Sequence, residues 1–449
     1  MNRESRMNRK VGFISLGCPK NQCDTEVMLH TLLSAGYQIT GEETEADVVV
    51  INTCGFIESA KKESIDSILD IAWLKENKDL SGIIVCGCLA ERYREELLSE
   101  LPEIDAIIGI GALDKITEAC DSILFSDEDK YVALPAKDAC KLGGDRIVTT
   151  GDVYAYIKIS EGCDNRCAYC AIPSIRGGLR SRTIEDIVAE AKDLDEMGIK
   201  ELVVVAQDTT VYGRDIYGEI KLAELLQAIT RETKIPWIRL LYCYPDKITD
   251  ELIEEIKNND RIVKYIDLPI QHISDNMLTA MNRHGDAACI KDAIRRLREI
   301  DGMVIRTTAI VGFPGETEED FTELCEFVRD AKFERFGAFP YSREEDTPAY
   351  DFDNQIDEQT KQDRFDIIMR SQLENSEKYN ESFVGTYQTV LCEGFDEVSE
   401  NYFGRTYRDA AEIDGKVWFT SHRPVTEGEF VSVKITDAMD YDLVGEVTV

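Results

Sequence analysis

The amino-acid sequence predicts an α/β protein in three parts: an N-terminal parallel α/β sheet, a central partial (β/α)6 barrel and a small C-terminal all-β barrel. Three observations support this prediction. Short apolar runs alternate with amphipathic helical stretches through the first 125 residues. The alternation resumes near residue 152, where successive strand starts lie 48, 35, 28, 39 and 32 residues apart, as in βα units. From residue 382, short strands and Gly-containing turns replace the helical pattern.

The N-terminal part, residues 9–125, is expected to alternate strands and helices. Its expected strands are Val11–Ser15, Asp47–Asn52, Gly82–Val85 and Ala106–Ile108. Its expected helices are Asp24–Leu33, Ile57–Leu74 and Glu91–Leu98. This order predicts parallel strands with helices on the faces of the sheet. Residues 126–151 are polar, contain Gly143-Gly144 and are expected to form a linker.

The central part, residues 152–381, is expected to contain six βα units, which are too few to close an eight-fold barrel. The expected strands are Tyr154–Ile159, Leu202–Val205, Trp237–Tyr242, Tyr265–Leu268, Val304–Val311 and Phe336–Phe339. The expected helices are Ile184–Met197, Leu222–Ile229, Asp250–Asn258, Ile290–Ile300 and Glu318–Ala331. A long charged helix over Gln359–Tyr379 is expected to end the series.

The C-terminal part, residues 382–449, is expected to form a small β-barrel or sandwich. Its expected strands are Thr386–Leu391, Val417–Phe419 and Phe430–Ile435. From Phe383 to Val449 it holds 5 basic and 13 acidic residues, a net charge of −8.

The whole chain of 449 residues is strongly acidic, with 51 Lys and Arg against 87 Asp and Glu and a formal net charge of −36. Binding to a phosphate backbone depends on Lys and Arg displacing counterions, so this composition disfavours a general nucleic-acid binder and favours a basic protein partner.

We see no apolar run of signal-peptide or membrane-helix length, so we expect a cytoplasmic protein without a membrane partner. In that reducing compartment the 14 cysteines are expected to be metal ligands, redox groups or small buried hydrophobes.

Three cysteines, Cys163, Cys167 and Cys170, lie on one short segment just past the first expected barrel strand. The carboxyl ends of barrel strands form the catalytic face of this kind of fold. Structural zinc usually requires two separated CxxC pairs or Cys with His, and neither is present here. Three thiolates on one loop can instead hold three irons of a [4Fe–4S] cluster and leave the fourth iron open for a ligand.

A second set of cysteines, Cys18, Cys54 and Cys88, is dispersed at intervals of 36 and 34 residues. Each follows the carboxyl end of an expected parallel strand, where ligands bind in open α/β folds. Because adjacent strands lie about 4.8 Å apart, the three thiols can converge on one cluster, although the spacing does not require it. Cys23 and Cys86 compete for this role, but we expect them to face the helix and the strand interior.

The remaining six cysteines are scattered singly and are interpreted as structural or incidental. They are Cys120, Cys140, Cys243, Cys289, Cys325 and Cys392.

The CxxxCxxC loop after the first barrel strand resembles that of the radical S-adenosylmethionine superfamily. The resemblance implies that the open iron chelates the amino and carboxylate groups of S-adenosylmethionine. One electron would then cleave this cofactor to a 5′-deoxyadenosyl radical. Tyr169 matches an aromatic position of the superfamily, which implies a place beside the cofactor; core packing is the alternative, and both can hold.

The segments around the dispersed cysteines (SLGCPKN, INTCGFI and GCLAERY) resemble the N-terminal domain of methylthiotransferases, and the last part of the chain resembles their TRAM domain. This resemblance implies an auxiliary [4Fe–4S] cluster on Cys18, Cys54 and Cys88 that carries the sulfur. One S-adenosylmethionine would methylate that sulfur, and a second would supply the radical that removes hydrogen from the substrate. The two clusters would be the catalytic groups, and no side chain is assigned as acid or base.

Within methylthiotransferases, three stretches resemble the enzymes that modify a ribosomal protein more than those that modify tRNA. They are Ser15–Asn21, Lys158–Arg182 and Tyr441–Val447. The implied substrate is an aspartate of small-subunit ribosomal protein S-twelve, whose β-carbon gains a methylthio group. An electron donor such as flavodoxin or ferredoxin and a sulfur donor are implied as further partners. The acidic TRAM domain complements a basic ribosomal protein better than tRNA, and improved solubility is the alternative reason for its charge.

A few residues at the expected barrel edge are further candidates for binding the cofactor: Gln207, Gln271, Arg306 and Gly312. Gly312 begins a GFPGE segment that either borders the cofactor or forms only a tight strand-to-helix turn. Arg306 lies in an apolar strand and would be costly to bury without a carboxylate.

A short basic run, Arg176, Arg180 and Arg182, follows the cysteine loop. These arginines either bind a cofactor or substrate carboxylate or pair with the chain's own acids, and we favour the second interpretation.

Two other functions stay open at this point. One is a tRNA adenosine methylthiotransferase with the same chemistry and a different docking surface. The other is a non-catalytic iron–sulfur electron carrier, against which stand the six-unit barrel and a cysteine loop without a fourth Cys.

Overall fold

The structure is a computed structural model that describes residues 3–126, 129–139 and 141–448. The chain separates into two compact units. The first combines residues 1–149, 160–182 and 342–350, and the second combines residues 150–159, 183–341 and 351–449. The CxxxCxxC segment therefore belongs to the same unit as the N-terminal sheet, while the central sheet and the C-terminal barrel share the other. The three domains drawn from the sequence are a different division, and their borders stay a prediction.

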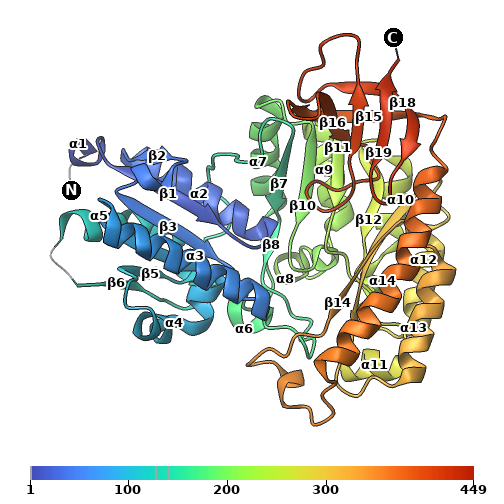
Figure 1. The fold of residues 1–449 in the computed structure, drawn as a ribbon, viewed down its shortest axis with the longest axis horizontal. Helices are drawn as coiled ribbons and strands as arrows, with labels where there is room; N and C mark the ends of the chain where they lie inside the picture. The colour runs from blue at the N-terminus through green and yellow to red at the C-terminus, as the bar shows by residue number, and fades with distance from the viewer. Residues whose placement is uncertain (1–2, 127–128, 140, 449) are drawn as a thin grey trace. The chain divides into compact units, whose positions relative to one another are not determined.

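The first unit is built on a six-stranded parallel sheet (Figure 1). In spatial order its strands are β2 (Gln38–Thr40), β1 (Lys10–Ser15), β3 (Val48–Thr53), β4 (Gly82–Gly87), β5 (Ala106–Ile108) and β6 (Tyr131–Ala133). The four predicted strands are all present. The outer strands β2 and β6 are additions, and β6 lies inside the segment expected to be a linker, which is therefore partly ordered. Both have only three residues and are partly exposed, so neither produces an apolar run in the sequence.

Helices cover both faces of this sheet because its central strands alternate between two cores. Val48 and Val50 belong to one core, which includes residues of α2 (Pro19–Ala35) and α5 (Ile116–Phe125). Val49 and Ile51 belong to the other, which includes residues of α3 (Glu58–Asn77) and α4 (Cys88–Glu100). Burial on both faces explains the continuous apolar run of β3, which is typical of parallel sheets. The helices of this part are α1 (Arg3–Arg6), α2 (Pro19–Ala35), α3 (Glu58–Asn77), α4 (Cys88–Glu100) and α5 (Ile116–Phe125). The CxxxCxxC segment adds β8 (Ser160–Glu161), α6 (Ile172–Arg176) and β9 (Arg180–Ser181).

The second unit contains a six-stranded sheet in which every pair of neighbours is parallel, so the predicted partial (β/α)6 barrel is confirmed. Its strands, in spatial order, are β14 (Arg335–Pro340), β13 (Val304–Val311), β12 (Ile262–Asp267), β11 (Trp237–Leu240), β10 (Glu201–Val205) and β7 (Tyr154–Lys158). Its helices are α7 (Ile184–Glu196), α8 (Arg214–Tyr217), α9 (Leu222–Glu232), α10 (Asp250–Asn258), α11 (Asp275–Ala280), α12 (Ala287–Leu297), α13 (Glu318–Ala331) and α14 (Glu358–Glu381).

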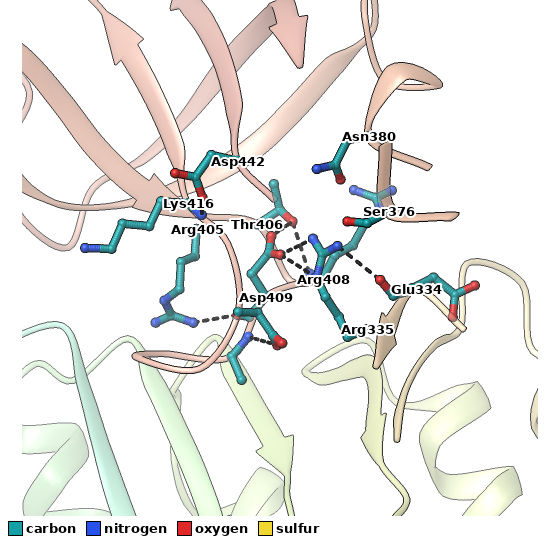
Figure 2. A network of polar contacts seen from close by, with 12 residues as sticks. Glu334, Arg335, Ser376, Asn380, Arg405, Thr406, Arg408, Asp409, Lys416 and Asp442 are labelled. Carbon is teal, nitrogen blue, oxygen red and sulfur yellow. Dashed lines mark hydrogen bonds and ion pairs between the residues drawn. The ribbon is translucent and has the colours of Figure 1, made fainter. Parts of the chain in front are cut away.

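The C-terminal strands close into a barrel, drawn in red in Figure 1, as the sequence predicted. Around the barrel they are β15 (Tyr387–Asp396), β16 (Asn401–Arg405), β17 (Val417–Thr420), β19 (Leu443–Val447) and β18 (Phe430–Ala438). The core packs Val390, Val417 and Phe419 with other apolar side chains. A buried ion pair joins this barrel to the central sheet: Figure 2 shows Arg335 of β14 reaching Asp409, whose main-chain carbonyl accepts from Arg405.

In the part of the chain that the structure describes, no helix is both long and apolar enough to cross a bilayer.

Candidate functional site

The three dispersed cysteines follow three neighbouring strands of the N-terminal sheet. Cys18 immediately precedes α2, Cys54 directly follows β3, and Cys88 directly follows β4 and is the first residue of α4. Because β1, β3 and β4 are adjacent and parallel, their carboxyl ends meet at one edge of the sheet. The fold thus places all three thiols at the edge expected from the sequence.

Two glycines let the cysteine-bearing loops approach one another closely. Gly17 has a φ of +92°, and a Cβ there would lie 2.8 Å from Cβ of Cys54. A Cβ on Gly55 would lie 2.9 Å from Cα of Leu89 and 3.1 Å from the carbonyl carbon of Cys88. Side chains at these positions would push the three loops apart, so the close packing depends on glycine.

Side-chain amides and a hydroxyl fix the same loops. Asn21 donates to the main-chain oxygens of Leu16 (2.9 Å) and Thr53 (3.0 Å). Asn52 donates to the main-chain oxygen of Asn21 at 2.8 Å. Ser64 of α3 accepts the Cys54 N–H at 3.0 Å and donates to its carbonyl at 2.9 Å. The loops are therefore held by the protein itself, which favours a prearranged ligand set.

The pKa values of these three thiols depend on burial, on one another and on nearby cations. Burial, together with the neighbouring Cys88 and Cys18, raises the pKa of Cys54 to about 12. Burial also raises the pKa of Cys88, while the nearby guanidinium of Arg176 opposes the shift. Burial would raise the pKa of Cys18 as well, but the charges of Lys20 and Arg176 outweigh it and lower the pKa. Deprotonating all three thiols therefore requires positive charge at this site.

The donor set fits an iron–sulfur cluster. Soft thiolates are the ligands of Fe–S clusters, and three cysteines leave one iron without a protein ligand. Among the described residues, no three His, Cys, Asp or Glu side chains are close enough together to hold a single metal ion. A cluster binds each thiolate through a different iron, so its ligands need not approach one another as closely as those of one ion.

The loop cysteines lie on a segment that is closed by its own main chain. The Cys163 N–H donates to the Gly177 carbonyl at 3.0 Å, and the Cys170 N–H donates to the Cys167 carbonyl at 3.0 Å. Cys163 and Cys170 are half-exposed, while Cys167 is buried. Three thiols within one eight-residue segment suit one cluster, as the spacing predicts.

The two cysteine sets are joined through α6 within the first unit. Cys88 packs against Ala171, the residue after Cys170, and against Ile175 of α6. Arg176, the last residue of α6, donates to Asn21 at 2.8 Å and to Glu161 at 2.9 Å, and it also pairs with Asp24 at 3.1 Å. The segment after the cysteine loop therefore lies against the edge that carries the dispersed cysteines.

The other candidates for cofactor binding lie mostly in the second unit. Gly312 has a φ of +71°, its N–H donates to Glu316 at 2.8 Å, and a Cβ would lie 2.3 Å from Cγ of Lys361. Gln271 also has positive φ (+68°), and its main chain bonds to β13 through Thr308 and Ile310. Both therefore have clear local structural reasons for their conformations, and their part in cofactor binding stays a prediction.

Arg306 contacts carboxylates of the chain itself. Its guanidinium lies 2.7 Å from Asp267 and 3.6 Å from Asp414. These two carboxylates of the chain balance its buried charge. Gln207 follows β10 and is partly buried, and Tyr169 is half-buried beside the loop cysteines. For these three residues the predicted contact with the cofactor stays a prediction.

For Arg176 the interpretation that we favoured, pairing with the chain's own acids, agrees with the structure, while for Arg180 and Arg182 it stays a prediction. Arg176 is buried among acids, Arg180 donates to the Asp138 carbonyl at 3.0 Å, and the guanidinium of Arg182 lies against Gly143. The sequence did not identify Arg176 as a neighbour of the dispersed thiols. Its only signal was its place six residues after Cys170.

The remaining described cysteines are mostly buried away from these sets. Cys86 lies in the core of the sheet, and Cys23 accepts a weak hydrogen bond from Arg146 at 3.8 Å. Cys120, Cys243 and Cys392 are buried, while Cys289 and Cys325 are partly exposed. Cys140 lies outside the described residues.

Comparisons with known proteins match three separate ranges of the chain. Residues 10–109 match the Uncharacterized protein family UPF0004, residues 157–328 the Radical SAM superfamily, and residues 384–448 the TRAM domain. Two relatives are named ribosomal protein uS12 methylthiotransferase RimO. The one from Acetivibrio thermocellus is 50% identical over 98% of this chain and 99% of its own length. The one from Thermoanaerobacter sp. strain X514 is 50% identical over 98% of this chain and its whole length.

A solved structure with the same fold is the radical S-adenosylmethionine methyltransferase TsrM from Kitasatospora setae. The two share a TM-score of 0.58 at 15% identity, over 85% of this chain and 81% of TsrM. The likeness supports the fold assignment alone.

Proposed function

This chain belongs to the ribosomal protein uS12 methylthiotransferase family of radical S-adenosylmethionine enzymes, and we propose that it adds a methylthio group to the β-carbon of an aspartate in uS12. The observation that carries this proposal is the position of its two three-cysteine sets. Both belong to one compact unit, where Cys88 of one set packs against Ala171, which follows Cys170 of the other. Sulfur insertion needs a radical source and a sulfur carrier in one enzyme, and this arrangement offers a ligand set for each.

We assign one cluster to each cysteine set. Cys163, Cys167 and Cys170 would hold the cluster that binds S-adenosylmethionine, and Cys18, Cys54 and Cys88 would hold the auxiliary cluster. When bound, the two clusters supply a radical able to take hydrogen from an unactivated C–H bond and a sulfur atom to replace it. The protein fixes the thiols through Asn21 and Ser64 and keeps the sites partly buried, which limits the access of water to a reactive radical.

The C-terminal barrel supports a protein substrate rather than tRNA. Its sequence carries 13 acidic and 5 basic residues. Four of the five cations are engaged within the unit. Arg405 pairs with Glu201 and Glu393, Arg408 donates to Gln388, Lys416 lies over the Phe403 ring, and Arg423 pairs with Glu429. Cations that already have partners contribute little to binding a phosphate backbone. The excess of acidic residues instead complements the positive charge of a basic ribosomal protein.

An anaerobic assay with both substrates tests the proposal. Reconstituted enzyme, S-adenosylmethionine, a reductant and sulfide are incubated with uS12 or with tRNA, and both products are analysed by mass spectrometry. We expect a methylthio group on one aspartate of uS12 and none on tRNA. Product on tRNA alone would replace the proposal with a tRNA methylthiotransferase, and no 5′-deoxyadenosine from either reaction would favour an iron–sulfur electron carrier.

Iron analysis tests the assignment of two clusters. Reconstituted wild-type protein should contain about eight irons per chain, because each three-cysteine set holds one four-iron cluster. Protein with Cys163, Cys167 and Cys170 all replaced by Ala should keep about four. A reproducible value near four in the wild type and near zero in the triple variant would remove the auxiliary site.

A further inference from the structure

The buried guanidinium of Arg176 lies between the two cysteine sets. Its side chain is 1% exposed. One nitrogen lies 2.9 and 3.0 Å from the two carboxylate oxygens of Glu161 and 3.1 Å from Asp24, and the other lies 2.8 Å from the amide oxygen of Asn21. These partners come from β8 and from α2, so one side chain of α6 connects the cysteine-loop segment to the N-terminal sheet.

The same guanidinium lies beside the dispersed thiols. Ile175, the residue before Arg176 in α6, packs against Cys88. Asn21, which accepts a hydrogen bond from Arg176, also donates to the main-chain oxygens of Leu16 and Thr53, in the segments that lead to Cys18 and Cys54. An ion pair with Glu161 and Asp24 alone would not require this second set of neighbours. Arg176 thus pairs with two carboxylates and lies at the edge of the sheet that carries the three sulfur ligands.

Charge balance gives this position a chemical meaning. A sulfur atom held at the open iron of a three-cysteine cluster adds negative charge to a site that already gathers three thiolates. The two carboxylates bonded to Arg176 add more, and Lys20, a buried cation, lies two residues after Cys18 in the chain. In a buried site, such charge is costly unless a cation or hydrogen-bond donor faces it.

We propose that Arg176 is a positioning residue for the sulfur to be transferred: its guanidinium faces the anionic sulfur species at the Cys18–Cys54–Cys88 site and holds α6 against that site. The inference rests on the proposed function, since it assumes the auxiliary cluster. It goes further by naming the side chain that makes the site selective for an anionic sulfur ligand.

The test uses full-length protein in which Cys163, Cys167 and Cys170 are replaced by Ala, so that any cluster signal comes from the auxiliary site. In this background Arg176→Gln removes the charge but keeps a hydrogen-bonding side chain, and Arg176→Lys keeps the charge. Arg146→Gln is the matched control. Arg146 is also buried, pairs with Glu26 of the same helix α2, and bonds to Cys23, which is not an assigned ligand. Circular dichroism checks the fold of each variant.

Two measurements follow: the midpoint potential of the cluster by redox titration with electron paramagnetic resonance, and the affinity for added sodium sulfide by the change in that spectrum. We expect Arg176→Gln to shift the potential to more negative values and to weaken sulfide binding by about tenfold, as for the loss of a charged hydrogen-bond donor. Arg176→Lys should retain most of the wild-type potential, and Arg146→Gln should retain all of it.

Three results would overturn the inference. Arg176→Gln with unchanged potential and sulfide affinity would do so, and so would equal losses in Arg176→Gln and Arg176→Lys, because the role would then be packing and not charge. A potential shift of the same size in Arg146→Gln would show that any buried arginine paired with an acid of α2 has this effect. If the background protein binds no iron at all, the auxiliary site itself is wrong, which is a failure of the proposed function and is recognised before any arginine is changed.

Discussion

Replacing Cys54 with Ala should reduce methylthiolation of uS12 to below about a hundredth of the wild-type rate while S-adenosylmethionine cleavage continues. Cys54 belongs to the dispersed set at the end of β3, whereas the cofactor-binding cluster is assigned to the loop from Cys163 to Cys170. Removing one thiol of three leaves the auxiliary cluster with two protein ligands. The change therefore separates sulfur insertion from radical formation.

The measurement compares two products in the same anaerobic reaction. Chromatography quantifies 5′-deoxyadenosine, and mass spectrometry of uS12 quantifies the methylthio group. The matched control is Cys86→Ala, two residues before Cys88. Its thiol lies in the core, 3.9 Å from Sδ of Met28 and 3.7 Å from the Ile51 carbonyl oxygen. Because it is only packed there, its loss should lower stability slightly and leave both products near wild-type amounts.

The outcomes distinguish the two cysteines clearly. Full methylthiolation by Cys54→Ala would mean that the dispersed set is not the sulfur site. Loss of methylthiolation alone in Cys86→Ala would make Cys86 a ligand in place of one of its neighbours. Loss of 5′-deoxyadenosine in Cys54→Ala would mean that the two sets do not act separately.

Hydrophobic periodicity predicted the long elements because it reflects their burial directly. Helices α10 (Asp250–Asn258) and α13 (Glu318–Ala331) begin and end at the predicted residues, where Thr249 and Thr317 cap them. Strands β2 and β6 were not predicted, because three partly exposed residues are too few to give a hydrophobic pattern. Their places at the sheet edges are determined by pairing with distant strands, which a local pattern does not contain.

The candidate site shows the same division between local and distant information. The positions of Cys18, Cys54 and Cys88 after strands were enough to predict that they share one edge, because parallel strands align their carboxyl ends. The role of Arg176 was not predictable in this way. Its partners Asn21, Asp24 and Glu161 lie 155, 152 and 15 residues away along the chain, and many other acids were equally available in an acidic sequence.

Replacing Arg405 with Met should destabilise the second unit by about 3 to 5 kcal/mol, because it leaves buried carboxylates without a counter-charge. Arg405 is 1% exposed and lies 2.7 Å from both Glu201 and Glu393, while Arg239 lies 2.5 Å from Glu201 on its other side. Burial alone would raise the pKa of Glu201, but the charges of Arg239 and Arg405 outweigh it and hold the pKa below its usual value. The carboxylate therefore stays charged and needs both partners.

The network in Figure 2 shows why this loss should affect more than one pair. Arg405 also donates to the Asp409 carbonyl at 2.8 Å, and the Asp409 carboxylate accepts from Arg335 of β14. The Arg405 side chain thus supports the loop through which the C-terminal barrel contacts the central sheet. Removing it leaves Glu201 with one cation and loosens the loop that carries Asp409.

Calorimetry of the full-length protein measures the effect, and we expect the melting temperature of this unit to fall by roughly 10 °C. Arg423→Met is the matched control in the same barrel, because Arg423 and its partner Glu429 are exposed to solvent and such pairs contribute little.

The pH dependence gives a second check. Since the pKa of Glu201 is lowered in the folded state, its ion pairs stabilise the protein above the unfolded value of about 4.3 and this stability is lost on further acidification. The difference between wild type and Arg405→Met should therefore be largest near neutral pH and shrink in acid. An equal difference at all pH values would mean that Arg405 stabilises the interface by packing and not by charge.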